Sequence, residues 1–545
     1  MRYRNWLALP IVLAVAVGTT SPVDAGQRSS STSPVYASGS ANSAHAGSGS
    51  RRVVGPTVPT TATTVTTSAP DTTNAATSAP DTVTTATTSA PDTVSSPGVS
   101  IVPTGPVFSP TVSWSPCGAG VECGVLTTLL DPTDPGSPKV QVGAARRSAR
   151  TLNRIGILLV NPGGPAGSAV DMVTDPGLER SMPPLLRGRF DVIGIDPRGT
   201  ARSVPVLCAG APNGSNDEER AKSFSASCGA RSGSILPFVG TDLSADDLEA
   251  MRIALGEQQI SYLGFSWGTY LGGLYAQKYP DRVRSMILDG GVDPTRFGVA
   301  AREDQMRAQE RTLTEFLAAC ERSSTRSCPL KTPGKTTKLR YEEMLLIASR
   351  TGIGREKIDR DDLEALTGIL LGEDWSVLAR ALGELSKGGT ALTLSILDYL
   401  NGDPNSRYED GGYEGIACRD GFFASAHPEE AVSVAARAER YRAAAPHFLN
   451  FAGFWASEAT CTSWAAPPRP RAPFITTAGP RIMVIGNTLD LRTPIEWSRS
   501  IATQLGARMV SFDDYVHTAS FSGETCITNA TSRWLIDLIA PPAEC

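Results

Sequence analysis

The segment YLGFSWGTYLGGLYAQKYP, residues 262–280, places Ser266 between Gly264 and Gly268 at the junction of two patterns. The preceding QQISYLGF is apolar and β-branched, as in a buried strand, and the following WGTYLGGLYAQKY has helical periodicity up to Pro280. A Gly-x-Ser-x-Gly motif between a strand and a helix is typical of a nucleophilic serine on a sharp turn. Because this chain is rich in glycine, the motif alone would also fit an ordinary loop serine, and the strand and helix around it favour the nucleophile.

Short apolar runs on both sides of this segment predict the remaining strands of one sheet. The runs are IGILLVNPGG, FDVIGIDPRG, RSMILDGG, RIMVIGNTLD and ARMVSFDD, and most are separated by helix-compatible stretches. Such alternation is typical of a mostly parallel, doubly wound sheet with helices on both faces. Together with the Ser266 turn it predicts an α/β-hydrolase fold. The runs VECGVLTTLLD and KVQVGAARRSA predict an antiparallel strand pair ahead of that sheet.

Composition and periodicity divide the chain into five segments. Residues 1–25 combine arginines, an apolar stretch and small residues before a cleavage point, which predicts a signal peptide. Residues 26–110 are rich in Ser, Thr, Ala and Pro, which predicts disorder because too little apolar surface is available for burial. Residues 111–295 and 468–545 contain the strand runs and form the two parts of the predicted hydrolase core. The helical pattern over 296–467 predicts an inserted cap above the strand ends, where open α/β sheets bind ligands.

Charge and cysteine content limit the possible partners. The net charge of −5 lacks the basic excess of nucleic-acid-binding proteins, so no nucleic-acid partner is expected. The ten cysteines show no paired CxxC pattern, so no metal site is indicated, and no cofactor is implied. Export would place these cysteines in an oxidising compartment, where neighbours along the chain are expected to pair. The expected disulfides are Cys117–Cys123, Cys208–Cys228, Cys320–Cys328, Cys418–Cys461 and Cys526–Cys545.

A serine nucleophile needs a base, and the chain contains only four histidines. His45 lies in the low-complexity segment, and His427 and His447 lie in the predicted helical block. His517, in DDYVHTASFSG, follows the last predicted strand. Elimination therefore makes His517 the predicted base for Ser266.

The third member of such a triad is a carboxylate that lies between the serine and the histidine in chain order. Asp490 ends RIMVIGNTLD, the last strand run before that of the histidine, and is the favoured candidate for orienting the imidazole. Asp289, which ends RSMILDGG one strand earlier, is the rival. Its alternative role is to cap or brace the turn that follows its strand.

The oxyanion formed during acyl transfer needs backbone N–H donors. One donor is expected from Trp267, directly after the nucleophile, and another from the loop NPGGPAGSA, residues 161–169. In that loop Gly163 and Gly164 would let the backbone approach a substrate. A plain tight turn is the alternative interpretation of the loop.

The chain resembles secreted bacterial tripeptidyl aminopeptidases, which are α/β-hydrolase peptidases related to proline iminopeptidases. The resemblance is carried from about Trp114 to Cys545 by the ordered motifs NPGGPAGSA, DVIGIDPRGTARS, GFSWGTYLGGLYAQKYP, MILDGGVDP, YEGIACRD, NTLDLRTP and HTASFSGETC. It implies an exopeptidase that removes short peptides from free N-termini. The positions that match the family's triad and oxyanion donors are Ser266, Asp490, His517, Gly164 and Trp267. Departures from the usual pattern are Ala166 for glycine, Trp267 for tyrosine, Val516 for glycine, and a short tail after Cys526.

Recognition of a protonated α-amine calls for carboxylates in the cap. Glu414 and Asp420, in YEGIACRD, are the candidates for substrate binding because they belong to a family-like motif at the cap's edge. Exposed acids on a solvated surface are the alternative. Two other functions stay open: an esterase or lipase with the same triad, and a surface protein without catalytic activity.

The expected location is outside the cytoplasm, either secreted or associated with the cell envelope through residues 26–110. The apolar stretch near the N-terminus is too short to span a bilayer comfortably, so no transmembrane segment is expected in the mature chain.

Overall fold

A computed structural model describes residues 108–209, 213–401, 410–423, 426, 433–450 and 459–545. The predicted signal peptide, 1–25, and the predicted disordered segment, 26–110, up to residue 107 therefore lie outside the described residues. The described residues all belong to one compact unit.

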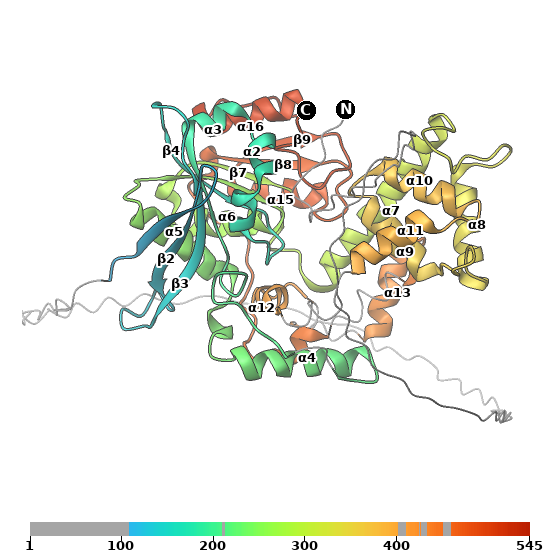
Figure 1. Cartoon of the computed structure of the whole chain (residues 1–545), viewed down its shortest axis with the longest axis horizontal. Helices are drawn as coiled ribbons and strands as arrows, with labels where there is room; N and C mark the ends of the chain where they lie inside the picture. The colour runs from blue at the N-terminus through green and yellow to red at the C-terminus, as the bar shows by residue number, and fades with distance from the viewer. Residues whose placement is uncertain (1–107, 210–212, 402–409, 424–425, 427–432, 451–458) are drawn as a thin grey trace, which may run out of the picture. The chain divides into compact units, whose positions relative to one another are not determined.

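Nine strands form one sheet in the order β1-β2-β3-β5-β4-β6-β7-β8-β9 within the described residues (Figure 1). The strands are β1 (Thr111–Gly118), β2 (Val121–Leu129), β3 (Lys139–Arg147), β4 (Gly156–Asn161), β5 (Phe190–Ile195), β6 (Ile260–Phe265), β7 (Val283–Asp289), β8 (Ile482–Asn487) and β9 (Arg508–Phe512). β1, β2, β3 and β5 pair antiparallel in succession, and every pair from β5 through β4 to β9 is parallel. The mostly parallel α/β sheet predicted from the apolar runs is confirmed.

The central strands are buried because apolar side chains alternate between two hydrophobic cores, one on each face of the sheet. All residues of β4, β6 and β8 are buried. In β6, Tyr262 points into one core, whereas Leu263 and Phe265 point into the other. This two-sided burial is why these strands are continuous apolar runs in the sequence rather than alternating patterns.

Helices that connect the strands cover both faces. They are α1 (Ala169–Thr174), α2 (Pro176–Ser181), α3 (Pro184–Arg189), α4 (Asp217–Ser232), α5 (Thr241–Ala254), α6 (Trp267–Lys278), α15 (Ile495–Leu505) and α16 (Thr525–Asp537). Side chains of α5, α6 and α15 belong to the core on one face, and side chains of α1, α3 and α16 belong to the core on the other. Short 3₁₀ helices lie at Leu236–Phe238, Pro280–Arg282, Thr460–Ser463 and Gly479–Arg481.

A helical insertion lies between β7 and β8, where the sequence predicted a cap. Its described helices are α7 (Gly298–Arg322), α8 (Thr337–Arg350), α9 (Arg360–Leu370), α10 (Trp375–Leu385), α11 (Ala391–Asn401), α12 (Gly412–Arg419) and α13 (Val434–Ala444). Figure 1 shows α7 to α11 and α13 gathered into one helical group. Helix α12 differs, because its residues Ile416, Ala417 and Cys418 belong to the core of the sheet. Together with Ala301 of α7, which belongs to the same core, α12 shows that part of the predicted cap segment 296–467 packs with the hydrolase core.

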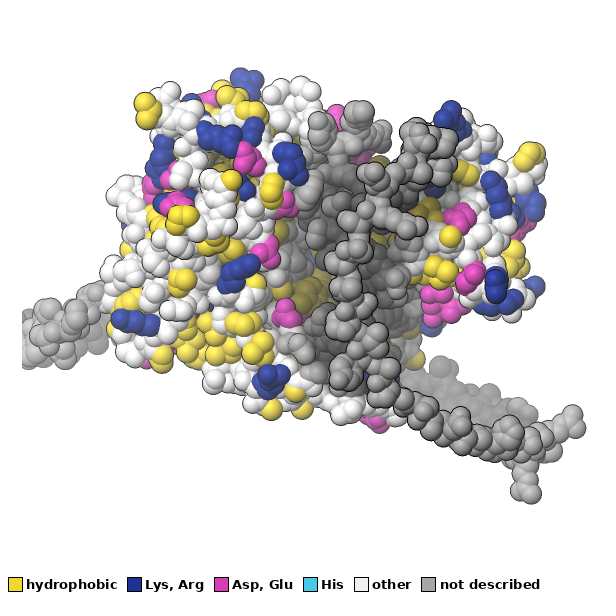
Figure 2. Space-filling model, in the orientation of Figure 1, with side chains coloured by type: hydrophobic (Ala, Val, Ile, Leu, Met, Phe, Trp, Pro, Cys, Tyr) yellow, Lys and Arg dark blue, Asp and Glu magenta, His cyan; other side chains and the backbone are white. Residues whose placement is uncertain are grey.

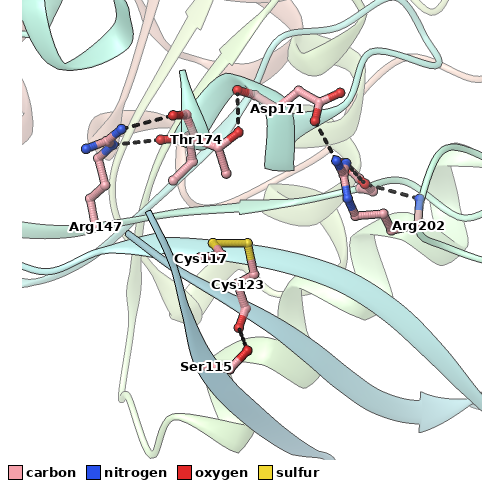
Figure 3. Close-up of a disulfide and its surroundings, with 9 residues drawn as sticks. Ser115, Cys117, Cys123, Arg147, Asp171, Thr174 and Arg202 are labelled. Atoms are coloured by element: carbon pink, nitrogen blue, oxygen red, sulfur yellow. Dashed lines mark hydrogen bonds and ion pairs between the residues drawn. A yellow bond between two sulfur atoms is a disulfide. The ribbon is translucent and has the colours of Figure 1, made fainter. Parts of the chain in front are cut away.

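The five disulfides expected from neighbouring cysteines all form in the structure. The first, Cys117–Cys123, joins β1 to β2, and Figure 3 shows it beside Arg147 of β3. Basic and acidic side chains are interspersed over the face seen in Figure 2. Within the described part of the chain, no helix is both long enough and apolar enough to span a bilayer.

Candidate active site

Ser266 occupies a strained turn between β6 and α6. Its φ of 53° and ψ of −122° lie outside the regions that side-chain-bearing residues favour, as is typical of a nucleophile held by its surroundings. The two flanking glycines let β6 and α6 cross closely, because a Cβ at Gly264 would lie 2.3 Å from the carbonyl oxygen of Gly268. The Ser266 side chain is half-buried at this crossing. The local chain path therefore presents its hydroxyl at the carboxyl edge of the sheet.

The glycine-rich loop after β4 packs directly against this turn. Gly163 has a φ of 90°, and a Cβ at this position would lie 2.4 Å from the carbonyl oxygen of Phe265. The sequence suggested that Gly163 makes room for a substrate, but its missing side chain makes room for the nucleophile turn. The loop is held by Asn161, whose Oδ1 accepts the N–H of Gly163 at 2.9 Å.

Two backbone N–H groups near Ser266 are free to stabilise an oxyanion. The amides of Gly164 and Trp267 donate no hydrogen bond to any described residue. Gly164 has a φ of 116°, and Trp267 is the first residue of α6, so its N–H has no partner within the helix. This geometry is compatible with the predicted pair of oxyanion donors.

Asp490 and His517 are brought together by the loops after β8 and β9. His517 Nδ1 lies 2.9 Å from Asp490 Oδ2 and 3.1 Å from Oδ1, and both side chains are buried. Asp490 Oδ1 also accepts the backbone N–H of Arg492 at 2.8 Å and that of Thr493 at 3.0 Å. With Nδ1 directed at a carboxylate, the other ring nitrogen, Nε2, is left to exchange a proton with a substrate or a nucleophile.

No hydrogen bond joins Ser266 to His517 among the described residues, but the end of β7 ties their two segments together. The N–H of Ser266 donates to the carbonyl oxygen of Asp289 at 2.8 Å. The Asp289 carboxylate accepts the N–H groups of Ala519 at 3.0 Å and Ser520 at 2.7 Å, and the Ser520 hydroxyl at 2.6 Å. Asp289 therefore braces the loop behind His517 rather than the turn that follows its own strand. Burial raises the pKa of Asp289 to about 6.

Thr493 is a supporting residue that the sequence did not single out, and Asp196 supports the glycine-rich loop. Thr493 Oγ1 lies 2.6 Å from Asp490 Oδ2 and 3.3 Å from His517 Nδ1, so it contacts both members of the pair. Asp196 Oδ1 accepts the Ser168 hydroxyl at 2.6 Å, at the end of the glycine-rich loop. The short spacing between Asp490 and Thr493 was a readable signal, because threonine hydroxyls often bond to groups three residues away.

Cap residues contact both loops that carry the Asp490–His517 pair. Trp375, at the start of α10, stacks on Tyr515 with ring centroids 4.3 Å apart. Gln305 of α7 donates from Nε2 to the carbonyl oxygen of Arg492 at 2.7 Å. Glu373 forms an ion pair with Arg492, and burial raises its pKa while the charges of Arg492 and His517 oppose that rise.

The two predicted substrate-binding acids have different surroundings. Asp420 is buried and accepts the N–H of Thr241 at 3.1 Å, together with the Thr241 hydroxyl. Because Trp267 Nε1 donates to the same hydroxyl at 2.9 Å, Asp420 is linked to the residue after the nucleophile. Burial raises the pKa of Asp420 to about 6.

Glu414 is half-buried on α12, and its carboxylate has no side-chain partner among the described residues. Burial raises its pKa to about 7, and the nearby charge of Asp410 acts in the same direction. A substrate-binding role for Glu414 and Asp420 stays a prediction. Of the two, Glu414 is the acid whose carboxylate is not engaged with another described side chain.

Comparisons with known proteins add independent information. A family model described as alpha/beta hydrolase fold matches residues 156–327, and one described as TAP-like protein matches residues 447–545. The chain is 30% identical over 486 residues to the serine protease Hip1 of Mycobacterium tuberculosis, which covers 80% of this chain and 91% of that protein. It is equally 30% identical over 488 residues to carboxylesterase B of Mycobacterium tuberculosis, covering 82% and 92%. A tripeptidyl aminopeptidase of Streptomyces coelicolor is 32% identical over 209 residues, covering 34% and 39%.

Proposed function

This chain belongs to the α/β-hydrolase family with a TAP-like C-terminal region and is a serine hydrolase, and from that premise we propose that it is a secreted aminopeptidase. The proposed reaction releases short peptides, with tripeptides as the expected product, from substrates with free N-termini. The observations that support the proposal are the buried Asp490–His517 pair and the strained Ser266 turn, which both follow the carboxyl ends of parallel strands. Relatives named serine protease and tripeptidyl aminopeptidase support peptide substrates.

In the proposed mechanism, Ser266 Oγ attacks the carbonyl carbon of the scissile peptide while His517 takes its proton. Asp490 holds the imidazole ring and stabilises the imidazolium. The N–H groups of Gly164 and Trp267 stabilise the oxyanion. His517 then protonates the leaving amine, and water hydrolyses the acyl-enzyme by the same route. The Ser266–His517 hydrogen bond would form when substrate binds, since such contacts are often long in the free enzyme.

For recognition of the free N-terminus we propose Glu414, because its half-buried carboxylate has no side-chain partner in the part of the chain that the structure describes. With a pKa of about 7, Glu414 becomes mostly ionised only above neutral pH. A bound ammonium group would favour the ionised form, so affinity for free-amine substrates should rise between about pH 6 and pH 8. Asp420, bonded to Thr241, is better placed to support Trp267 than to contact substrate.

Secretion is proposed from the N-terminal sequence and the disulfides. Five disulfides are typical of proteins that fold in an oxidising compartment. Association with the cell envelope through residues 26–110 is part of the same proposal. Fractionation of cells that express the full chain would test both.

The test of function uses tripeptide p-nitroanilides with a free N-terminus and the same compounds N-acetylated. We expect cleavage of the free-amine substrates, and Ser266→Ala should lower kcat/KM by about 10⁴-fold or more. Glu414→Gln should raise KM for free-amine substrates and leave the slow turnover of acetylated ones unchanged. Glu439→Gln, at an exposed acid of α13, is the matched control. Equal cleavage of acetylated and free substrates would overturn the aminopeptidase assignment and leave a serine hydrolase.

An esterase is the second candidate function, because carboxylesterase B is as similar to this chain as Hip1 is. The triad geometry serves esters and amides alike. The ratio of kcat/KM for p-nitrophenyl acyl esters to that for tripeptide anilides separates the two candidates. A phosphonate that labels Ser266 would not, since both enzymes would react. Failure of that label would instead favour the protein without catalytic activity.

A further inference from the structure

A cavity of about 380 Å³ lies between the β1–β2 hairpin, the end of β3 and helix α2. The pairing of the strands shows where the cavity lies along the sheet. Arg147, in the cavity wall, pairs with Val192 of β5, which pairs with Leu158 of β4, which in turn pairs with Ser261 of β6. Ser266 lies five residues after Ser261 and directly follows the end of β6, so about 16 Å of extended chain separates the two levels. The cavity is therefore at the amino end of the parallel strands, away from the candidate active site.

Basic side chains dominate one wall of this cavity. Glu179 pairs with Arg147 at 2.8 Å and with Arg150, and Arg187 Nη1 lies 3.7 Å from the same carboxylate. The charge of Asp175 also acts on Arg147. Three guanidinium groups therefore share the negative charges of Glu179 and Asp175, which leaves one positive charge without a matching acid among the described residues.

Three further observations support an excess of positive charge at this wall. The other carboxylate of the cavity wall, Glu122, is already paired with Arg146 at 2.6 Å. The Nε–H of Arg187 is buried and has no hydrogen-bond partner among the described residues. Burial and the charge of Arg150 both lower the pKa of Arg147. A buried, unpaired donor beside crowded cations is the environment that an anion would stabilise.

The opposite wall is apolar and held in place. Leu178, Met182 and Phe190 line it and are buried in the core. The hairpin that closes the cavity is cross-linked by Cys117–Cys123. Figure 3 shows Arg147 near this disulfide, with its guanidinium bonded to the carbonyl oxygen of Thr174 at the end of α1. The cavity is thus preformed, with an apolar body and a cationic rim.

We propose that this cavity binds a medium-chain carboxylate. The carboxylate would pair with Arg187 and Arg150, and the hydrocarbon chain would lie against Leu178, Met182 and Phe190. A monoanion matches the single uncompensated positive charge. A hydrocarbon chain would cover the apolar wall, which an inorganic anion would leave exposed. The volume is at the lower end of the range for small-molecule sites, which favours a medium-length chain.

The test is calorimetric titration of the full chain with decanoate, after Ser266 has been blocked with a phosphonate so that the active site cannot contribute. We expect saturable binding of decanoate, and binding at least about tenfold weaker for acetate and for decanol. Arg187→Gln and the cavity-filling Met182→Trp should each weaken decanoate binding about tenfold or more. Arg180→Gln removes an exposed arginine of the same helix as Glu179 and should change binding less than about twofold.

Thermal melting establishes which variants are folded, and Arg150→Gln, at a more exposed position, replaces any variant that is not. The proposal is overturned if decanol binds as tightly as decanoate, or if Arg187→Gln binds decanoate like the unmodified chain. It is also overturned if decanoate binds only before Ser266 is blocked, because the ligand would then occupy the catalytic site. These outcomes are independent of whether the enzyme prefers peptides or esters.

Discussion

The end of β7 and the loop after β8 each carry a fully buried aspartate, and the two differ in what faces them. Asp490 faces the ring of His517, with Nδ1 2.9 Å from its carboxylate. Asp289 faces the backbone N–H groups of Ala519 and Ser520 and the Ser520 hydroxyl. A carboxylate directed at an imidazole can orient it and stabilise its charged form. A carboxylate directed at main-chain donors fixes the path of a loop, so the contacts assign different roles to two otherwise similar residues.

Position in the chain favoured Asp490 as the partner of the histidine but left Asp289 as a rival. Both aspartates follow an apolar strand run, and both lie between Ser266 and His517 in chain order. The partners of Asp289 are about 230 residues away in sequence, as shown by its bonds to Ala519 and Ser520. These contacts predict that substitutions of the two residues have effects that differ in size and in kind.

Asp490→Asn should have the largest effect. An amide in place of the carboxylate would favour the wrong tautomer of His517 and would not stabilise the imidazolium, so we expect kcat/KM to fall about 10³- to 10⁴-fold. The free energy of unfolding should change by less than the effect on catalysis, because the site keeps its shape. Steady-state kinetics and urea unfolding measure the two quantities. Asp513→Asn, at an exposed aspartate bonded to Thr488, is the matched control and should retain activity.

Asp289→Asn should reduce activity less and stability more. The amide N–H₂ group would meet the donors of Ala519 and Ser520, and the loop behind His517 would shift. We expect kcat/KM to fall about 10- to 100-fold and the free energy of unfolding to fall by about 2 kcal/mol. Loss of activity as large as that of Asp490→Asn, without destabilisation, would reverse the two assignments.

Thr493→Val should have a smaller effect on activity than Asp289→Asn, and this effect should be confined to the Asp490–His517 pair. The substitution keeps the shape of the side chain but removes the hydroxyl that contacts both Asp490 and His517. One donor to the carboxylate is lost while the backbone N–H groups of Arg492 and Thr493 remain. We expect kcat to fall about tenfold with little change in KM, as measured with a saturable peptide anilide. An unchanged kcat would show that these backbone bonds suffice.

Most of the sheet could be predicted because its central strands are short apolar runs between glycine- or proline-containing turns. All six runs assigned to the mostly parallel part form strands, as do the two runs of the antiparallel pair. Strand β1, residues Thr111–Gly118, was not predicted, because it is an exposed edge strand with polar residues and Pro116. The disulfides were predictable because each joins one cysteine to the next cysteine along the chain.

Residues of the candidate site could be predicted only where a residue type or motif is rare in this chain. The Ser266 motif and the scarcity of histidine pointed to residues that the structure places at one edge of the sheet. Roles that depend on packing were not readable. Asp420 is a predicted substrate-binding acid, and no pattern in the sequence indicated its bond to Thr241, a residue 179 positions away. Gly163 was expected to face substrate, yet it packs against Phe265.

Ser520→Ala should have the smallest effect, and only a pH dependence reveals it. Asp289 has a pKa of about 6 in the folded protein, above its usual value of 3.8, so the folded state holds the extra proton between about pH 4 and pH 6. Between these pH values the free energy of unfolding falls as pH rises, because Asp289 loses its proton at lower pH in the unfolded chain than in the folded protein. The Ser520 hydroxyl lowers this pKa by bonding the ionised form. Its removal should raise the pKa further.

The destabilisation by Ser520→Ala should therefore be small near pH 4, where Asp289 is protonated in both proteins, and should grow to about 1 kcal/mol at pH 8. The kcat/KM of Ser520→Ala should be close to that of the parent protein at pH 8 and lower by a few-fold at pH 6. The acid limb of its pH–activity profile should move to higher pH because the pKa of Asp289 is raised. Urea unfolding and kcat/KM measured across this range test both. Ser522→Ala, in the same loop, should show neither trend. A destabilisation independent of pH would mean that the Ser520 hydroxyl acts through packing rather than through the ionised carboxylate, and Asp289 would then brace the loop in either protonation state.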